Sequence, residues 1–180
     1  MKNIIEIKWS LFFDILGWDY DYKSKNLNGH ISTFILNFEK PILVIIKSEI
    51  NEIEIINFID LVKKSGWENE FLILGSSPKF YNNFIIGGLS IKLGMLYDKI
   101  WNQERTDCIL SGCASCNGLT FISDTGSFQC RKCGDYDGDH LLCDCGYNTK
   151  DIKEMWDNVS NKINSLNLLN FHKKSLNENI

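Results

Sequence analysis

Arginine is scarce in this chain. Only two arginines, Arg105 and Arg131, occur among the 180 residues, and the net charge is −4. A protein that envelops nucleic acid needs clustered lysine and arginine to neutralise the phosphates. The composition therefore excludes a strongly basic surface over the whole molecule, and a bound nucleic acid would meet a local patch.

Long apolar runs are also lacking. The apolar opening, residues 1–18, is interrupted by Glu6, Lys8 and Asp14, whereas a membrane span needs about 20 largely apolar residues. We therefore expect a cytoplasmic protein with no membrane partner. A glycine-rich phosphate loop, a nucleophile elbow and the spacing of a catalytic triad are absent from the sequence as well.

Cysteine, by contrast, is abundant, and four of the seven cysteines form two short pairs. Cys113-Ala-Ser-Cys116 and Cys130-Arg-Lys-Cys133 are separated by thirteen residues. Each pair places two thiolates on one tight turn, and two facing turns supply the four sulfurs of a closed tetrahedral zinc site. The spacing predicts a zinc ribbon whose ligands are Cys113, Cys116, Cys130 and Cys133.

Disulfide bonding is the alternative for these pairs. Seven cysteines without a secretory segment favour metal binding, and Gly134 after Cys133 suits a turn that needs a positive φ. Cys143 and Cys145 could replace one pair as ligands or pack as buried thiols, and Cys108 is more typical of a small core residue. Zinc would supply on the order of 10 kcal/mol of folding free energy to so small a module, so its predicted role is structural.

The apolar periodicity predicts an α/β fold. Helices are expected at 3–16, with Asn3 as cap and Gly17 as terminator, and at 50–65. Strands are expected at 18–23, 31–38, 42–47, 71–74 and 90–97, with a loop over 75–88. The stretch 42–47 is apolar up to Lys47, which is typical of a central strand covered on both faces.

The chain divides into four predicted segments. They are an α/β domain over 1–100, the zinc ribbon over 108–146, a C-terminal helix over 149–170 and a disordered tail over 171–180. The closing helix should bury one stripe of side chains, made of Ile152, Met155, Trp156, Val159 and Ile163.

Three short stretches carry a family resemblance: E-I-K-W-S-L-F-F at 6–13, I-S-T-F-I-L at 31–36 and V-I-I-K at 44–47. They resemble the motifs E-A-R-W-A-x-F-F, L-P-D-F-x-L and V-E-V-K of phage-type PD-(D/E)xK nuclease-like proteins that carry a C-terminal zinc ribbon. The resemblance implies a restriction-endonuclease-like mixed sheet flanked by helices, with the ribbon inserted or appended. It also implies a viral protein located in the host cytoplasm.

Two positions of the resemblance depart from the nuclease pattern. In PD-(D/E)xK nucleases two carboxylates share a divalent metal while a lysine orients the attacking water. Here Thr33 and Ile45 stand where the acids are expected, and Lys47 remains. Neither side chain replaces a carboxylate as a magnesium ligand. The resemblance therefore implies a pseudoenzyme, with Glu6 and Lys47 as vestigial residues that could form a buried ion pair.

Nucleic-acid binding is the leading functional hypothesis. Lys47 could contact a phosphate, and Arg131 and Lys132 form a second cationic pair on the ribbon. Phe121 and Phe128 could add a stacking surface, although core packing is the alternative for both.

Two other hypotheses compete with it. An acidic face over 135–144 could make the protein an interaction module that inhibits or adapts a host or phage complex. Alternatively, the neighbouring acids Asp19, Asp21, Glu49 and Glu52 could rebuild a metal site, which would make the protein an active metal-dependent nuclease.

Overall fold

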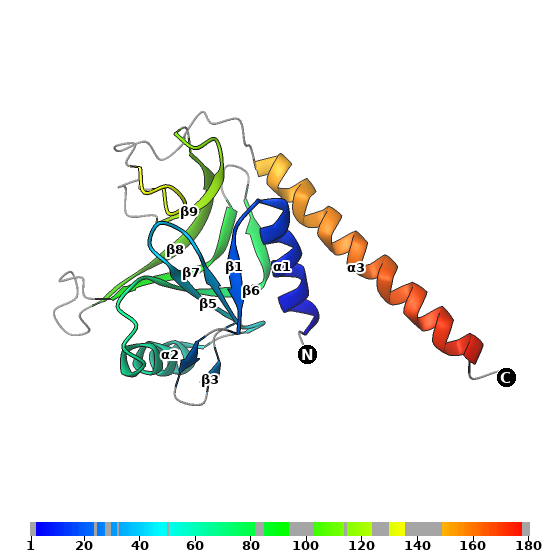
Figure 1. Ribbon diagram of the computed structural model, residues 1–180, viewed down its shortest axis with the longest axis horizontal. Helices are drawn as coiled ribbons and strands as arrows, with labels where there is room; N and C mark the ends of the chain where they lie inside the picture. Colours follow the sequence, from blue (N-terminus) through cyan, green and yellow to red (C-terminus); the bar gives the residue numbers. More distant parts are fainter. Residues whose placement is uncertain are drawn as a thin grey trace.

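The computed structural model describes residues 3–23, 25–27, 30–31, 33–49, 51–81, 85–93, 103–113, 115–123, 130–135 and 149–177. The helices in these ranges are α1 (Ile4–Ile15), α2 (Glu52–Lys64) and α3 (Thr149–Asn177). The strands are β1 (Tyr20–Tyr22), β2 (Asn26–Leu27), β3 (His30–Ile31), β4 (Phe34–Leu36), β5 (Ile42–Ile46), β6 (Phe71–Phe80), β7 (Ile85–Leu93), β8 (Gln103–Gly112) and β9 (Leu119–Ser123). Figure 1 shows a curled sheet, with α1 and α3 packed on one face and α2 on the other.

One mixed sheet organises the molecule. Its order is β1-β4-β5-β6-β7-β8-β9, while β2 and β3 form a separate two-stranded hairpin. The pair β5 and β6 is parallel and is joined through α2, and every other neighbouring pair in the sheet is antiparallel. The predicted α/β class and the order helix, three strands, helix, strand are confirmed, with the small hairpin inserted before β4.

Both early helices begin with a reciprocal capping box. At α1 the Asn3 side chain accepts from the Glu6 amide at 2.8 Å, and the Glu6 carboxylate accepts from the Asn3 amide at 3.0 Å. Asn51 and Glu54 repeat the arrangement at α2. Such boxes satisfy amides that the helix itself leaves unpaired. Gly17, with φ +62°, then lets the chain leave α1 as predicted.

Strand β5 is covered on both faces, as its apolar sequence predicts. Ile42 and Val44 belong to the cluster that contains the buried face of α1. Leu43 and Ile45 face the other way and pack with the buried side chains of α2. The two cores lie on opposite faces of the strand because successive side chains alternate.

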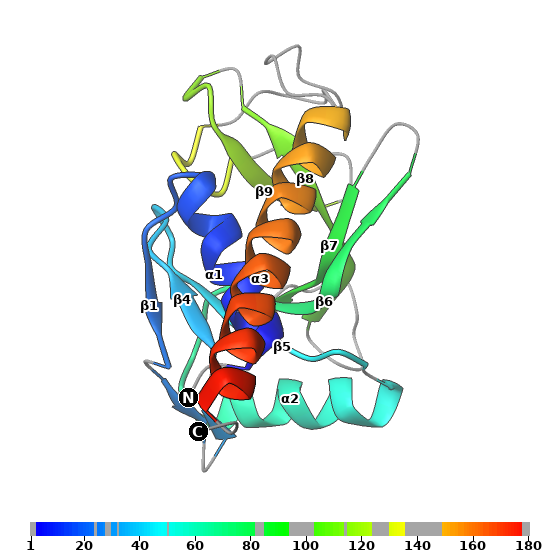
Figure 2. The ribbon, with the colours of Figure 1, turned by 90° about the vertical axis from the view of Figure 1, so that its right-hand side faces the viewer.

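Helix α3 packs along α1 (Figures 1 and 2). The predicted stripe is confirmed: Ile152, Trp156, Val159 and Ile163 are buried, and Met155 is partly buried. The helix continues to Asn177, where we expected its end at 170 and a disordered tail from 171. Residues 149–177 contain neither proline nor glycine, so no residue type in this segment interrupts the helix. Its C-terminal end extends beyond the sheet in Figure 1.

The loop predicted over 75–88 is wrong. Strand β6 runs to Phe80 and pairs with β7, with a register shift between Leu74 and Lys79. This register shift explains how Pro78, a residue typical of turns, fits within a strand. Proline has no amide hydrogen to donate, and a bulge tolerates the missing donor. Gly88 allows the two strands to approach, since a Cβ there would collide with the Ile73 carbonyl oxygen.

Strands β8 and β9 continue the same sheet. Strand β8 pairs with β7 over most of its length, and β9 pairs with β8. Residues 108–112, which the sequence assigns to the ribbon, therefore belong to a strand of the main sheet, and Cys113 follows it directly. None of the helices in the described ranges has the length and apolar character that crossing a membrane requires.

Candidate metal centre

The four predicted cysteines converge on one point. The Cys113 and Cys133 sulfurs are 3.9 Å apart, the Cys116 and Cys130 sulfurs are 3.9 Å apart, and all four lie within 4.8 Å of one another. A tetrahedron with Zn–S bonds of about 2.3 Å has sulfurs about 3.8 Å apart. A disulfide needs a separation of about 2.05 Å, so the cysteines are free thiols, and their grouping could hold a metal ion. The predicted four-cysteine cluster is confirmed.

Two tight turns build the cluster. In the first, the Cys113 amide donates to the Gly118 carbonyl at 2.8 Å. In the second, the Gly134 amide donates to the Cys130 carbonyl at 2.9 Å, and the Cys133 amide points at the Cys130 sulfur at 3.4 Å. Gly134 has φ +76°, as its place after the second pair predicts. Amides directed at sulfur stabilise the thiolate that a metal ion requires.

The cluster disfavours several thiolates at once when no cation shares their charge. Burial and the neighbouring thiols raise the pKa of Cys133 to about 12. Burial also raises the pKa of Cys116. Burial acts on Cys113 in the same direction, but hydrogen bonds from the Cys116 amide and from neighbouring groups outweigh it and lower the Cys113 pKa. Four thiolates this close repel one another unless a metal ion shares their charge.

Both turns pack closely against the rest of the fold. Glu39, after β4, lies so close to Gly134 that a Cβ at this glycine would collide with its carboxylate. At the first turn, the Trp18 indole donates to the Leu119 carbonyl at 2.8 Å. Phe121 is 1% exposed and its ring lies 4.8 Å from that of Trp18. Phe121 is therefore a core residue rather than a stacking surface.

Arg131 points inward and not toward solvent. Its Nε lies 2.6 Å from the Glu70 carboxylate, and the two side chains are only 12% and 13% exposed. This ion pair argues against the prediction that Arg131 contacts nucleic acid, since the guanidinium is already engaged and largely buried. Its neighbour Lys132 is partly exposed and lies over Gly118 of the first turn.

The positions that the resemblance assigns to metal-binding acids are buried in the core. Ile45 is 1% exposed and packs under α2. Thr33 is 6% exposed, and its hydroxyl accepts from the Ile46 amide at 3.2 Å. Both side chains have structural contacts, and neither supplies a charged ligand.

The two vestigial residues do not meet. The Glu6 carboxylate accepts from the Tyr22 hydroxyl at 2.7 Å in addition to its capping role. Burial and this hydrogen bond raise the pKa of Tyr22. Lys47 lies 3.1 Å from the Glu54 carboxylate, with both side chains a little over one third exposed. The expected Glu6–Lys47 ion pair is therefore wrong, because each residue pairs with a neighbour on its own side of the sheet.

A pocket of about 420 Å³ opens at the end of β5. Its charged lining residues are Lys47, Glu49, Lys79 and Asp107, and Gly87 and Gly88 also line it. Lys79 and Asp107 carry no local sequence signal for this pocket, because the pairing of β8 with β7 brings Asp107 here from a distant part of the chain.

The other acids considered for a rebuilt metal site are scattered. Glu52 binds Arg105 through two contacts of 2.6 and 2.8 Å, and Asp19 accepts from Asn37 at 3.3 Å. Glu49 alone of the four lines the pocket. In the part of the chain that the structure describes, no three carboxylates or histidines gather as a second possible metal site.

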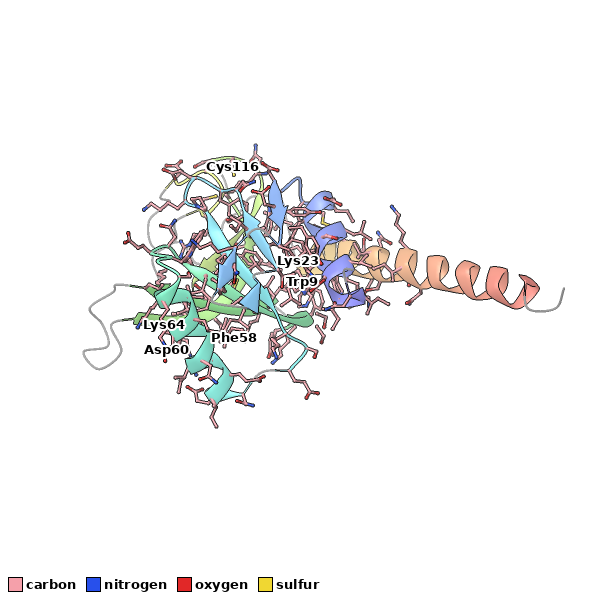
Figure 3. All side chains as sticks on the ribbon, turned by 60° about the horizontal axis from the view of Figure 1, so that its bottom comes forward. Trp9, Lys23, Phe58, Asp60, Lys64 and Cys116 are labelled. Carbon is pink, nitrogen blue, oxygen red and sulfur yellow. The ribbon has the colours of Figure 1, made fainter. Side chains whose placement is uncertain are left out.

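The two cationic sites are far apart. The Lys47 ammonium lies 5.9 Å from the ring centre of Phe58, on α2. Figure 3 shows Cys116 at the top of the view and Phe58 well below it, and Lys132 lies on the Cys116 side. Phe128, Cys143, Cys145 and positions 136–144 of the predicted acidic face lie outside the described residues.

Comparison with other proteins identifies no relative: no family model, curated protein or solved structure matches this chain. A nuclease-like family therefore stays a prediction from the sequence motifs.

Proposed function

We propose that this protein is a zinc-stabilised, nuclease-like protein that has lost its catalytic acids and binds nucleic acid at the pocket beside Lys47. The order α1, β1, β4, β5, α2, β6, with a parallel pair joined through α2, supports a restriction-endonuclease-like core. The motif resemblance supports the same assignment and a phage-type origin.

The structural role of zinc is supported by the fit of the four sulfurs to a tetrahedron. The ion closes the two turns at the edge of the sheet, and all four positions are taken by protein thiolates. Such a closed site stabilises a fold and leaves no open position for a substrate.

The binding proposal depends on the different environments of Ile45 and Lys47 at the end of β5. Ile45 is buried where a ligand for a catalytic metal would stand, while Lys47 leaves the strand at the wall of the pocket. Lys79 lines the same pocket, so a phosphate would meet the two ammonium groups beside the carboxylates of Glu49 and Asp107. A local site of this kind agrees with the overall charge of −4.

Fluorescence anisotropy with labelled single- and double-stranded DNA and RNA, measured over a salt series, tests the proposal. Lys47→Glu and Lys79→Glu should each weaken binding and flatten its salt dependence, since each removes about one phosphate contact. Lys64→Glu, an exposed position on α2, makes the same charge change away from the pocket and should bind like the wild type. Unchanged affinity in both pocket variants would contradict the proposal.

Cleavage is assayed in the same samples with magnesium or manganese. We expect intact substrate, because Thr33 and Ile45 provide no carboxylate for a catalytic metal. Cleavage abolished by Asp107→Asn or Glu49→Gln would instead identify an active nuclease with relocated ligands.

A protein-interaction module is the second candidate. Ile4 and Ile7 lie three residues apart on α1 and are 47% and 37% exposed, which leaves adjacent apolar area at the surface. Absence of nucleic-acid binding at low salt, together with a stoichiometric partner that Ile4→Ser/Ile7→Ser no longer retains, would favour this candidate.

A further inference from the structure

The Glu70–Arg131 ion pair connects the metal centre to the main sheet. Arg131 lies between the ligands Cys130 and Cys133, so the second turn positions its backbone on both sides. Glu70 directly precedes β6, far from the cysteines in sequence. The two charged groups meet at 2.6 Å with little exposure to solvent.

Two further strands contribute to the surroundings of this pair. The Ser90 hydroxyl, on β7, donates to the Glu70 carboxylate. The Thr120 hydroxyl, on β9, accepts from the Arg131 amide at 3.1 Å. Ser90 is 2% exposed and Thr120 is fully buried, so both hydroxyls belong to the interior. The side chain of Arg131 thus reaches across the curl of the sheet to the start of β6.

Cys108, on β8, is a buried thiol in the core of the same sheet, next to β7, the strand that carries Ser90. Its thiol is fully buried and separate from the four-cysteine cluster. Burial raises its pKa well above the usual value, and the Glu70 carboxylate acts in the same direction. A buried thiol with a raised pKa is unreactive as long as the strands around it stay closed.

Loss of the metal removes the constraint that positions Arg131. Without the ion the two turns are held by a few backbone hydrogen bonds, and small metal-bound modules usually unfold when the metal is withdrawn. A guanidinium that swings out leaves Glu70 as a largely buried carboxylate without its cation, which is strongly unfavourable. The surrounding strands must then open to let water reach it.

We infer that metal occupancy of the four-cysteine site is transmitted to the main sheet through Arg131, so that the loaded site keeps the sheet closed over Cys108 and the empty site opens it. The inference depends on the metal site of the proposed function but not on nucleic-acid binding. Metal binding at the ribbon would then stabilise the closed state of the main sheet as well as the two cysteine turns. We call this coupling the clamp.

Site-resolved thiol alkylation followed by mass spectrometry, combined with hydrogen–deuterium exchange, tests the clamp. In the zinc-loaded protein, Cys108 should resist alkylation and the start of β6 should exchange slowly. Removal of zinc with a chelator should speed both by roughly tenfold or more, because local opening exposes the segment. Zinc content is measured in each sample.

Arg131→Gln separates the clamp from the metal site itself. This variant keeps all four cysteines and should retain one zinc per chain, yet alkylate at Cys108 about as fast as the metal-free protein. Lys132→Gln changes the adjacent residue of the same turn and should stay protected. Adding Glu70→Gln to Arg131→Gln removes the uncompensated carboxylate and should restore part of the protection. Slow exchange in α1 and α2 confirms that each variant remains folded.

The outcomes distinguish a failure of the metal site from a failure of the clamp. A protein that takes up no zinc overturns the metal site proposed above. A protein that binds zinc, but whose Cys108 is equally protected with and without the ion or in Arg131→Gln, overturns the clamp and leaves the metal site intact.

Discussion

Trp156 of α3 packs against Trp9 of α1 with ring centres 4.9 Å apart, which joins the two ends of the chain in one aromatic cluster. The Trp156 ring also meets Phe12 edge-on, with ring centres 5.2 Å apart. Both tryptophans are buried. The C-terminal helix is thus part of the core that covers one face of the sheet.

Trp156→Ala should therefore destabilise the whole fold. Removing a large buried aromatic side chain costs about 3–5 kcal/mol of the free energy of unfolding, which urea denaturation measures. Lys150→Ala, on the exposed side of α3, should change this free energy by less than about 0.5 kcal/mol. Equal stability of the two variants would show that α3 is not docked on α1.

The metal content should be one zinc ion per chain. Cys130→Ser removes a ligand and should lose the ion to a chelator far more readily than the wild type does, with a lower thermal midpoint. Cys108→Ala changes a cysteine outside the cluster and should retain the metal. Metal content after dialysis against the chelator measures both, and retention by Cys130→Ser would argue against the four-sulfur site.

Gly134→Ala should weaken the second turn. The positive φ of this residue disfavours a side chain by about 1–2 kcal/mol, and the new methyl group would collide with Glu39. Gly118→Ala is the matched control, because its Cβ would contact the flexible end of Lys132 at 3.3 Å. Thermal unfolding of the zinc-loaded variants should show a clear loss for Gly134→Ala and a small one for Gly118→Ala.

The Lys47–Glu54 contact predicts a pH dependence in acid. The hydrogen bond from Lys47, followed by the Asn51 amide, lowers the pKa of Glu54 below its usual value of 4.5. A carboxylate with a lowered pKa contributes stability above the unfolded value, and this contribution is lost as the pH falls through the folded value. Lys47→Met should raise the Glu54 pKa, which carboxyl carbon shifts in an NMR titration would report. An unchanged titration would exclude the contact in solution.

Local sequence signals predicted much of the fold correctly. Asn3 and Gly17 bound α1, and the apolar run up to Lys47 identified a strand covered on two faces. These signals succeed because capping, positive φ and side-chain alternation involve residues close together in the chain. The loop predicted around Pro78 failed for the complementary reason: pairing with β7 stabilises a strand that local propensity disfavours.

The sequence by itself determined the four-cysteine cluster, because each CxxC pair forms its own turn and four thiols at this spacing suit one metal ion. Tertiary structure alone decided the partners of the charged residues. Arg131 looked like a surface cation, yet the curl of the sheet brings Glu70 to it, and β8 carries Asp107 to the pocket beside Lys47. The free energy of a charge depends on its desolvation and on its nearest opposite charge, and both are set by strands distant in the sequence.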